Sequence, residues 1–387
     1  MATIRLPRPD RSLEEWRLGE PADLPLRAAG PFDRIAFAAA HVVHDPLADH
    51  DPWEEAAIDF EATSAWRHRL WDLGLAVAEA MDTAQRGAGL DWPAARALIA
   101  RSIAEAKTRK DAVLFSGVGT DHLLPRPDLS LAEVLRAYEE QIAFVEGLGG
   151  RVILMASRAL AAVARGPEDY LSVYTRLLEQ LREPVILHWL GEMFDPALAG
   201  YWGDRDHWRA METVLMLIEA QAPRIDGIKI SLLSKEKEIA MRRRLPAGVR
   251  MYTGDDFHYA ELILGDEQGH SDALLGIFDA IAPVASAALS ALARGDRERC
   301  LTLFAPTVPL SRHIFRNPTR YYKTGIVFLA WLNGHQSHFT MLGGQESARS
   351  LLHLAELFRL ADRAGLLRDP ELAASRMRHF LAVQGIV

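Results

Sequence analysis

Short apolar runs alternate with amphipathic segments along most of the chain after residue 34. Short runs of this kind, bounded by glycine, proline and polar residues, are typical of strands in a sheet covered on both faces. Segment 130–150 keeps Leu131, Val134 and Ile142 at helical spacing and ends in "GLGG", which predicts a helix. Segment 169–184 predicts a second helix. The predicted strands are 34–43, 73–81, 111–119, 151–157, 184–190, 226–231, 249–255 and 272–278.

Eight strands that alternate with helices predict an α/β fold, a (β/α)8 TIM barrel with a C-terminal helical extension. A doubly wound open sheet is the alternative, although no G-x-G-x-x-G follows the first strand, which weakens a dinucleotide-binding version. We expect an N-terminal extension over 1–30 with one short strand at "TIRLP", the barrel over 31–283, and a helical region over 284–387 that packs on the barrel.

Composition narrows the partners that such a barrel could have. The 387 residues carry a formal net charge of −8, which argues against nucleic acid or an anionic membrane as a partner. The single cysteine, Cys300, excludes an intramolecular disulfide and fits a reducing compartment. The longest apolar stretch, 280–293, is too short for a membrane span. We therefore expect a cytoplasmic protein with a small-molecule ligand.

Polar side chains gather where the predicted strands end. In a barrel of parallel strands these ends converge on the face that holds the active site. Each residue taken alone has a structural explanation; Asp255 and Asp256, for example, could cap the next helix. The set as a whole predicts a site: His41, His44, Asp45, Asp82, Thr83, Thr120, Asp121, His122, Ser157, Arg158, His188, Asp255, Asp256 and His258.

Lys229 is the most informative of the polar residues, because it lies inside a predicted strand, in "RIDGIKIS". Side chains alternate along a strand, so Lys229 shares a face with Gly227 and Ser231, and the isoleucines occupy the other face. We expect the glycine and serine face to line the barrel interior. Desolvation there favours the neutral amine, which can attack a carbonyl carbon and form a Schiff base. A structural ion pair is the alternative explanation.

Three segments then point to a family. "DGIKIS", "MYTGDD" and "GHSDALLGIFDAIAP" at 269–283 resemble the dihydrodipicolinate synthase and N-acetylneuraminate lyase superfamily. "EPVILHWLGEMFDP" and "VLFSGVGTD" resemble it more weakly, and together the likeness covers roughly 31–345. The resemblance implies a barrel enzyme with Lys229 as the Schiff-base lysine and no separate cofactor. His188 stands where the family has its proton-shuttling tyrosine, which makes it the candidate general acid and base.

The chain also departs from the family pattern. In the turn after the second strand, residues 82–86 replace Gly-Thr-Thr-Gly-Glu, and only Thr83 is kept. Asp82 would repel a substrate carboxylate but suits sugar hydroxyls. Pyruvate is therefore a doubtful substrate. Members of the family often form dimers or tetramers, so we expect a homo-oligomer. The residues assigned to substrate binding are Asp82, Thr83, Arg158, Asp255, Asp256 and His258.

The sequence thus predicts a class I lyase, an aldolase or dehydratase, acting on a small keto acid or keto sugar through Lys229. A metal-dependent barrel isomerase, epimerase or hydrolase is the alternative, with His41, Asp121 and His122 as candidate ligands of a divalent metal. A third possibility is a barrel that binds a sugar-like ligand without turning it over.

Overall fold

Eight parallel strands close into a barrel in the computed structural model, which describes residues 2–81 and 85–386. Each predicted apolar run overlaps one strand, so the (β/α)8 fold is confirmed and the open-sheet alternative is wrong. The strands follow one another in chain order around the barrel, and β10 closes it against β3. They are β3 (Ala36–Ala39), β4 (Ala76–Glu79), β5 (Leu114–Val118), β6 (Arg151–Leu154), β7 (Val185–Leu190), β8 (Ile225–Ser231), β9 (Arg250–Thr253) and β10 (Asp272–Leu275).

Alternation along the strands fills the barrel interior with a compact apolar cluster that includes Phe37, Phe115, Ile186 and Tyr252. The residues between them point outward and pack under the helices, as Ile228 and Ile230 of β8 do. Gly227 has no side chain because Tyr252 fills that space; a Cβ at Gly227 would lie 2.6 Å from the tyrosine ring. The inner face of β8 therefore carries Gly227, Lys229 and Ser231, as its sequence predicts.

Helices cover the outside of the barrel. Most begin at an Asp or Ser whose side chain accepts a backbone N–H of the first turn, as at Asp59, Asp91 and Ser157. Ser130 and Glu133 form a reciprocal capping box. These helices are α1 (Phe60–Asp72), α2 (Trp92–Lys107), α3 (Leu131–Gly147), α4 (Arg158–Val163), α5 (Pro167–Gln180), α6 (His207–Gln221), α7 (Lys235–Arg242), α8 (Tyr259–Leu264) and α9 (Ile277–Ala280).

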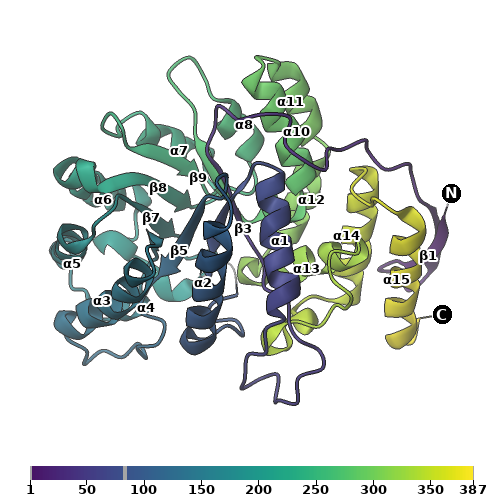
Figure 1. Ribbon diagram of the computed structural model, residues 1–387, viewed down its shortest axis with the longest axis horizontal. Helices are drawn as coiled ribbons and strands as arrows, with labels where there is room; N and C mark the ends of the chain where they lie inside the picture. Colours follow the sequence, from purple (N-terminus) through teal and green to yellow (C-terminus); the bar gives the residue numbers. More distant parts are fainter. Residues whose placement is uncertain (1, 82–84, 387) are drawn as a thin grey trace.

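The C-terminal part is helical and lies against one side of the barrel (Figure 1). In this part α11 packs on α8, α10 and α13 pack on α9, and α14 packs on α12 and α13. The helices are α10 (Ala282–Ala293), α11 (Arg297–Phe304), α12 (Thr307–Ile314), α13 (Tyr322–Leu332), α14 (Leu351–Arg363) and α15 (Pro370–Val383).

The N-terminal extension is a hairpin of two strands, β1 (Thr3–Pro7) and β2 (Leu13–Arg17), rather than the single strand that we expected. Figure 1 shows the hairpin beside α14 and α15, which come from the other end of the sequence. Trp16 Nε1 donates to Asp362 at 2.8 Å, and Arg359 Nη2 donates to the Pro7 carbonyl at 3.0 Å. The extension thus packs on the C-terminal helices. The boundaries of the three predicted regions stay a prediction.

None of the helices within residues 2–81 and 85–386 has the length and apolar character needed to cross a bilayer.

Glu238 fixes the end of β9, which leads into the candidate site. Its side chain is buried on α7 and accepts hydrogen bonds from Thr253 Oγ1 at 2.9 Å and Ser271 Oγ at 2.7 Å. Burial raises the pKa of Glu238 to about 8. The unfolded chain releases this proton near pH 4.5 and the folded chain near pH 8. The folded protein therefore holds Glu238 in its neutral form without loss of stability below about pH 4.5. As the pH rises from about 4.5 to 8, the free energy of unfolding falls.

We expect Glu238→Gln to abolish this loss, because a neutral amide can accept from one of the two hydroxyls and donate to the other without ionising. Urea unfolding should give the variant about 2–4 kcal/mol more stability than wild type at pH 8.5. The difference should shrink to within about 1 kcal/mol at pH 5. A difference of the same size at both pH values would show that ionisation of Glu238 is not its cause.

Candidate functional site

Lys229 and His188 lie side by side on the inner face of the barrel. They are direct partners in the register of β7 and β8. Both side chains are almost fully buried, with exposures of 3% for Lys229 and 1% for His188. His188 Nε2 lies 3.1 Å from Ser231 Oγ, the next inward-facing residue of β8. The parity argument from the sequence is therefore right: an amine and an imidazole face the same interior space.

The chain at the end of β9 leaves room for the lysine. A Cβ at Gly254 would lie 2.9 Å from Lys229 Cε. Real Cβ atoms are not found so close to another carbon, so any larger residue at position 254 would push Lys229 aside. Gly254 thus fixes the path of the lysine side chain toward the carboxyl-terminal mouth of the barrel.

Asp256 brings a buried carboxyl to the same region. Its Oδ1 accepts the Ile277 amide at 2.8 Å, and its backbone carbonyl accepts Ser311 Oγ. Burial raises the pKa of Asp256 to about 7, while the nearby charges of Lys229 and Lys323 oppose that rise. A carboxyl that titrates near neutrality beside a buried amine is a recognised mark of a functional site.

Asp255 and His258 have a more local geometry. Asp255 Oδ1 accepts the backbone amides of Phe257 and His258, which caps the turn after β9. Its Oδ2 lies 2.9 Å from His258 Nδ1, and this hydrogen bond raises the pKa of His258. This is the capping geometry that the sequence offered as the structural explanation for Asp255. Contact of either residue with substrate stays a prediction.

A cleft opens at the mouth of the barrel, above the inner face that carries His188. Leu190, two residues after His188 on β7, lines two adjoining parts of it. Both parts also share Arg86, Gly87, Arg158 and Asp195. The wider part has a cavity volume of about 320 Å³, which lies at the lower end of the range of small-molecule sites. Arg158, at the first position of α4, pairs its Nε with Asp195.

Arg86 is a structural member of the cleft wall. It is buried, it forms an ion pair with Asp121, and it donates to the Gly117 carbonyl at 2.7 Å. Gln141 of α3 completes the cluster: its Oε1 accepts from Arg86 and from the Gly119 amide, and its Nε2 donates to Asp121 and lies 2.8 Å from His122 Nδ1. The cluster fixes the loop after β5 in place.

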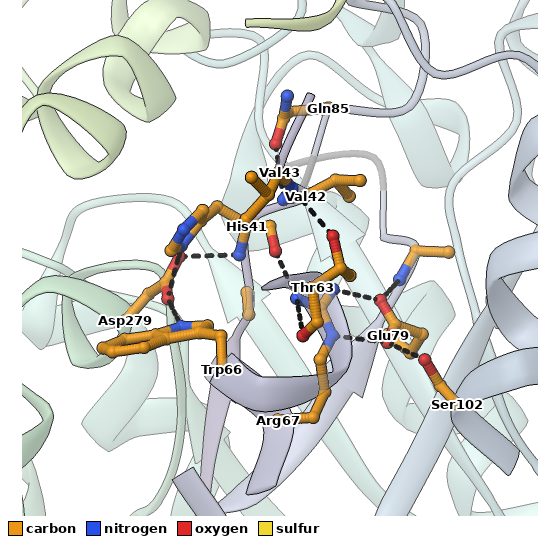
Figure 2. Close-up of polar contacts among 12 residues, drawn as sticks. His41, Val42, Val43, Thr63, Trp66, Arg67, Glu79, Gln85, Ser102 and Asp279 are labelled. Atoms are coloured by element: carbon orange, nitrogen blue, oxygen red, sulfur yellow. Dashed lines mark hydrogen bonds and ion pairs between the residues drawn. The ribbon is translucent and has the colours of Figure 1, made fainter. Parts of the chain in front are cut away.

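A second buried network fixes the end of β3, and Figure 2 shows most of it. Asp279 of α9 accepts the His41 amide at 2.8 Å and Trp66 Nε1 at 2.6 Å, and it lies 3.0 Å from His41 Nδ1. Lys323 of α13 donates to the same carboxylate at 2.9 Å and also to the Ala39 carbonyl. Burial alone would raise the pKa of Asp279, but the charges of His41 and Lys323 outweigh it and hold that pKa below its usual value.

The same network continues into the barrel wall. Arg67 of α1 makes two parallel hydrogen bonds to Glu79 of β4, at 2.9 and 2.8 Å, and both side chains are fully buried. Ser102 of α2 donates to the same carboxylate at 2.6 Å, and Arg67 also donates to the His41 carbonyl (Figure 2). Such bidentate pairs are strong and directional, so they hold α1, α2 and β4 in one arrangement.

The structure therefore places the predicted residues in different surroundings. Lys229, His188 and Asp256 gather inside the barrel mouth, and Arg158 lies in the cleft above. Asp82 and Thr83 lie outside the described residues. His41 is held in the cluster around Asp279, whereas Asp121 and His122 are held in the other cluster, around Gln141. Within the described ranges no group of three or more His, Cys, Asp and Glu side chains is arranged to hold a metal ion.

Sequence reasoning missed several residues that build these clusters. Lys323 and Asp279 each stand in an otherwise apolar run, "YYKTGIVFLAWL" and "GIFDAIAP", which is the signal that identified Lys229. Gln141 lies on the apolar stripe of its helix, where a polar residue needs a partner. Arg86 does not interrupt an apolar run, so its sequence context gives no comparable signal. The hydrogen-bond partners of its side chain come from three different segments.

The fold and the interior lysine define a TIM-barrel protein with a candidate active site at the carboxyl-terminal mouth, and known proteins show the same architecture. A dihydrodipicolinate synthetase-like protein of Pseudomonas aeruginosa is 19% identical, with a TM-score of 0.61 over 84% of this chain and 99% of its own. The Escherichia coli prophage protein YagE, of the dihydrodipicolinic acid synthase family and solved with pyruvate, is 14% identical, with a TM-score of 0.64 over 92% and 99%. The dihydrodipicolinate synthase of Thermotoga maritima is also 14% identical, with a TM-score of 0.64 over 86% and 99%.

Over residues 4–386 the chain matches the family described as "Protein of unknown function (DUF993)", and it belongs to that family. No curated protein sequence matches it significantly. At these identities the solved structures establish a shared fold. The resemblance of the segments around β8, β9 and β10 therefore reflects a shared barrel fold.

Asp279 offers a test of the network that fixes the mouth. We expect Asp279→Asn to lower the free energy of unfolding by about 3–5 kcal/mol, because it leaves the buried ammonium of Lys323 without its carboxylate. Thermal and urea denaturation measure the loss. Glu212→Gln, which breaks the exposed Arg244–Glu212 pair, is the control and should cost less than about 1 kcal/mol. Equal small losses in the two variants would contradict the account of the network.

Proposed function

We propose that this protein is a class I lyase, an aldolase or dehydratase, that acts on a small keto acid or keto sugar through a Schiff base on Lys229. The observation that carries the proposal is the burial of Lys229 on the inner face of β8, beside His188, whose strand continues to Leu190 in the wall of the open cleft. A lysine in such surroundings loses hydration as an ammonium ion, so its neutral, nucleophilic form becomes accessible.

The chemistry follows from the two side chains. Lys229 Nζ attacks the keto carbon, and the loss of one water molecule gives an iminium. In an aldol cleavage, a base removes the proton of the hydroxyl two carbons away, the carbon–carbon bond breaks, and its electrons neutralise the iminium to an enamine. His188 is our candidate for that base and for the acid that returns the proton. Water then releases the second product and restores the amine.

Several solved structures of this fold support the proposal by their own descriptions. They are described as dihydrodipicolinate synthases, and some were solved in complex with pyruvate, such as YagE and the enzyme of Acinetobacter baumannii. A keto acid is therefore a reasonable first ligand for this chain. Cytoplasmic location and assembly as a homo-oligomer stay predictions.

Borohydride trapping tests the proposal. We incubate the protein with pyruvate, hydroxypyruvate and longer keto acids and keto sugars, reduce it, and measure intact mass and peptide masses. The expected result is a gain of one reduced adduct on the peptide that contains Lys229, absent in Lys229→Met.

Lys235→Ala is the matched control, since Lys235 is an exposed lysine that pairs with Glu261. The control should keep the adduct in full. Adducts spread over surface lysines, or an adduct that persists in Lys229→Met, would contradict the assignment of Lys229.

The role of His188 has its own test. In deuterated buffer, the enamine formed on Lys229 should exchange the protons next to the keto carbon, and NMR follows that exchange. We expect His188→Gln to slow the exchange about 100-fold or more, while borohydride trapping still labels Lys229. Exchange at the wild-type rate would show that another group moves the proton.

Chelation separates this proposal from the metal-dependent alternative. We expect dialysis against EDTA to leave both trapping and proton exchange within about twofold of the untreated protein, because neither step uses a metal ion. Loss of both trapping and proton exchange, with recovery when Zn²⁺, Mn²⁺ or Mg²⁺ is added back, would favour the metal-dependent enzyme instead.

A further inference from the structure

The cleft at the barrel mouth has branches of opposite charge, and they diverge at Arg158 and Gly87, which line every branch described here. A Cβ at Gly87 would lie 3.5 Å from Arg158 Nη1, so the guanidinium stands close to the backbone at this junction. One branch runs toward the loop after β3 and the other toward the segment that leads into α13.

The branch toward the loop after β3 is acidic. Its walls carry Glu54, Glu55, Asp91 and Asp121. Of these, Asp121 is neutralised by Arg86, but the others keep this branch unfavourable for a negatively charged ligand.

The branch toward α13 is basic. Arg86, Arg158 and Arg320 line it, and Asp195 is the acidic residue among its described lining residues. Arg86 is fully engaged by its own cluster, and Asp195 takes the Nε of Arg158. Arg320 differs from these two arginines because it is exposed and no carboxylate in the described ranges lies at ion-pair distance from it. Its Nη2 donates a hydrogen bond to Tyr321 Oη at 2.8 Å. Its charge is therefore available to a ligand.

Arg320 is also held in position for such a ligand. Its guanidinium lies 4.7 Å from the centre of the Tyr321 ring, so the ring supports one face of it. Tyr322 anchors the segment, because its ring stacks on Phe315 at 4.3 Å between centroids and packs against Gly276 at the end of β10. Gln345 adds an amide to the same wall. These groups are the donors that proteins use to bind carboxylate or phosphate oxygens.

We infer that this branch is a subsite for a terminal oxyanion, a carboxylate or a phosphate, at the end of the substrate remote from the keto group, with Arg320 as its principal ligand. The inference rests on the proposed function, because it assumes that the keto group lies at Lys229. It narrows the substrate class to chains that are charged at the far end, and it makes pyruvate too short to use the whole site.

A matched pair of keto acids tests the subsite. 2-Oxohexanedioate and 2-oxohexanoate have the same carbon chain, and only the first ends in a second carboxylate. In borohydride trapping of the wild type, the half-saturating concentration should be about tenfold lower for the dicarboxylate, as one charge-assisted contact provides. The preference should diminish in high salt, because Arg320 is exposed.

Two variants test whether Arg320 causes the preference for the dicarboxylate. Arg320→Gln should abolish it, and Arg316→Gln, which removes an exposed charge from the preceding turn outside the described lining of the cleft, should keep it. Equal affinity for the two acids in the wild type, or a preference that survives Arg320→Gln, would overturn the inference while leaving the Schiff base intact. A phosphate-terminated keto acid of similar length then shows which oxyanion binds more tightly.

A second experiment distinguishes failure of the Schiff-base proposal from failure of the subsite. If neither acid is trapped, calorimetry with hexanedioate and hexanoate, which lack a ketone, measures the subsite alone. Tighter binding of hexanedioate by the wild type and by Lys229→Met, lost in Arg320→Gln, would support the subsite without the Schiff base. No detectable preference for hexanedioate would overturn the subsite as well.

Discussion

The removal of an amine from water inside a closed barrel is the constraint on which the account of this protein depends. An ammonium ion buried without compensation is costly, so the fold must either pair Lys229 or allow it to lose its proton. The surroundings supply His188 on the neighbouring strand, room made by Gly254, and a carboxyl on Asp256 whose pKa is raised to about 7 by its own burial. The Asp256 carboxyl can therefore gain or lose its proton near neutral pH.

The rest of the mouth is built to be rigid. The pair Arg67–Glu79 and the carboxylate of Asp279 tie β3, β4 and the helices α1, α9 and α13 together through buried, charge-assisted hydrogen bonds. Lys323, although a buried lysine like Lys229, donates to a carbonyl and a carboxylate and so has a structural role. Rigid surroundings of this kind are what a positioned nucleophile requires. Asp256 is influenced by the charges of both lysines, which links the rigid network to the surroundings of Lys229.

The sequence predicts much of this arrangement, because strand and helix periods are local signals. The eight strands and the inward direction of Lys229 follow from apolar patterning and alternation. The clusters around Arg86, Gln141 and Asp279 do not, since their partners lie from tens to hundreds of residues apart and local patterns carry no record of them. The second strand of the N-terminal hairpin was missed for a related reason. "LEEWR" lacks apolar alternation, and its place is set by pairing with β1 and by the hydrogen bond from Trp16 to Asp362 of α14.

The most direct test of the central claim is a crystal structure of the protein soaked with 2-oxohexanedioate. The account predicts continuous electron density between Lys229 Nζ and the keto carbon, with the far carboxylate at Arg320. Density for the ligand elsewhere, with Lys229 unmodified at full ligand occupancy, would contradict it.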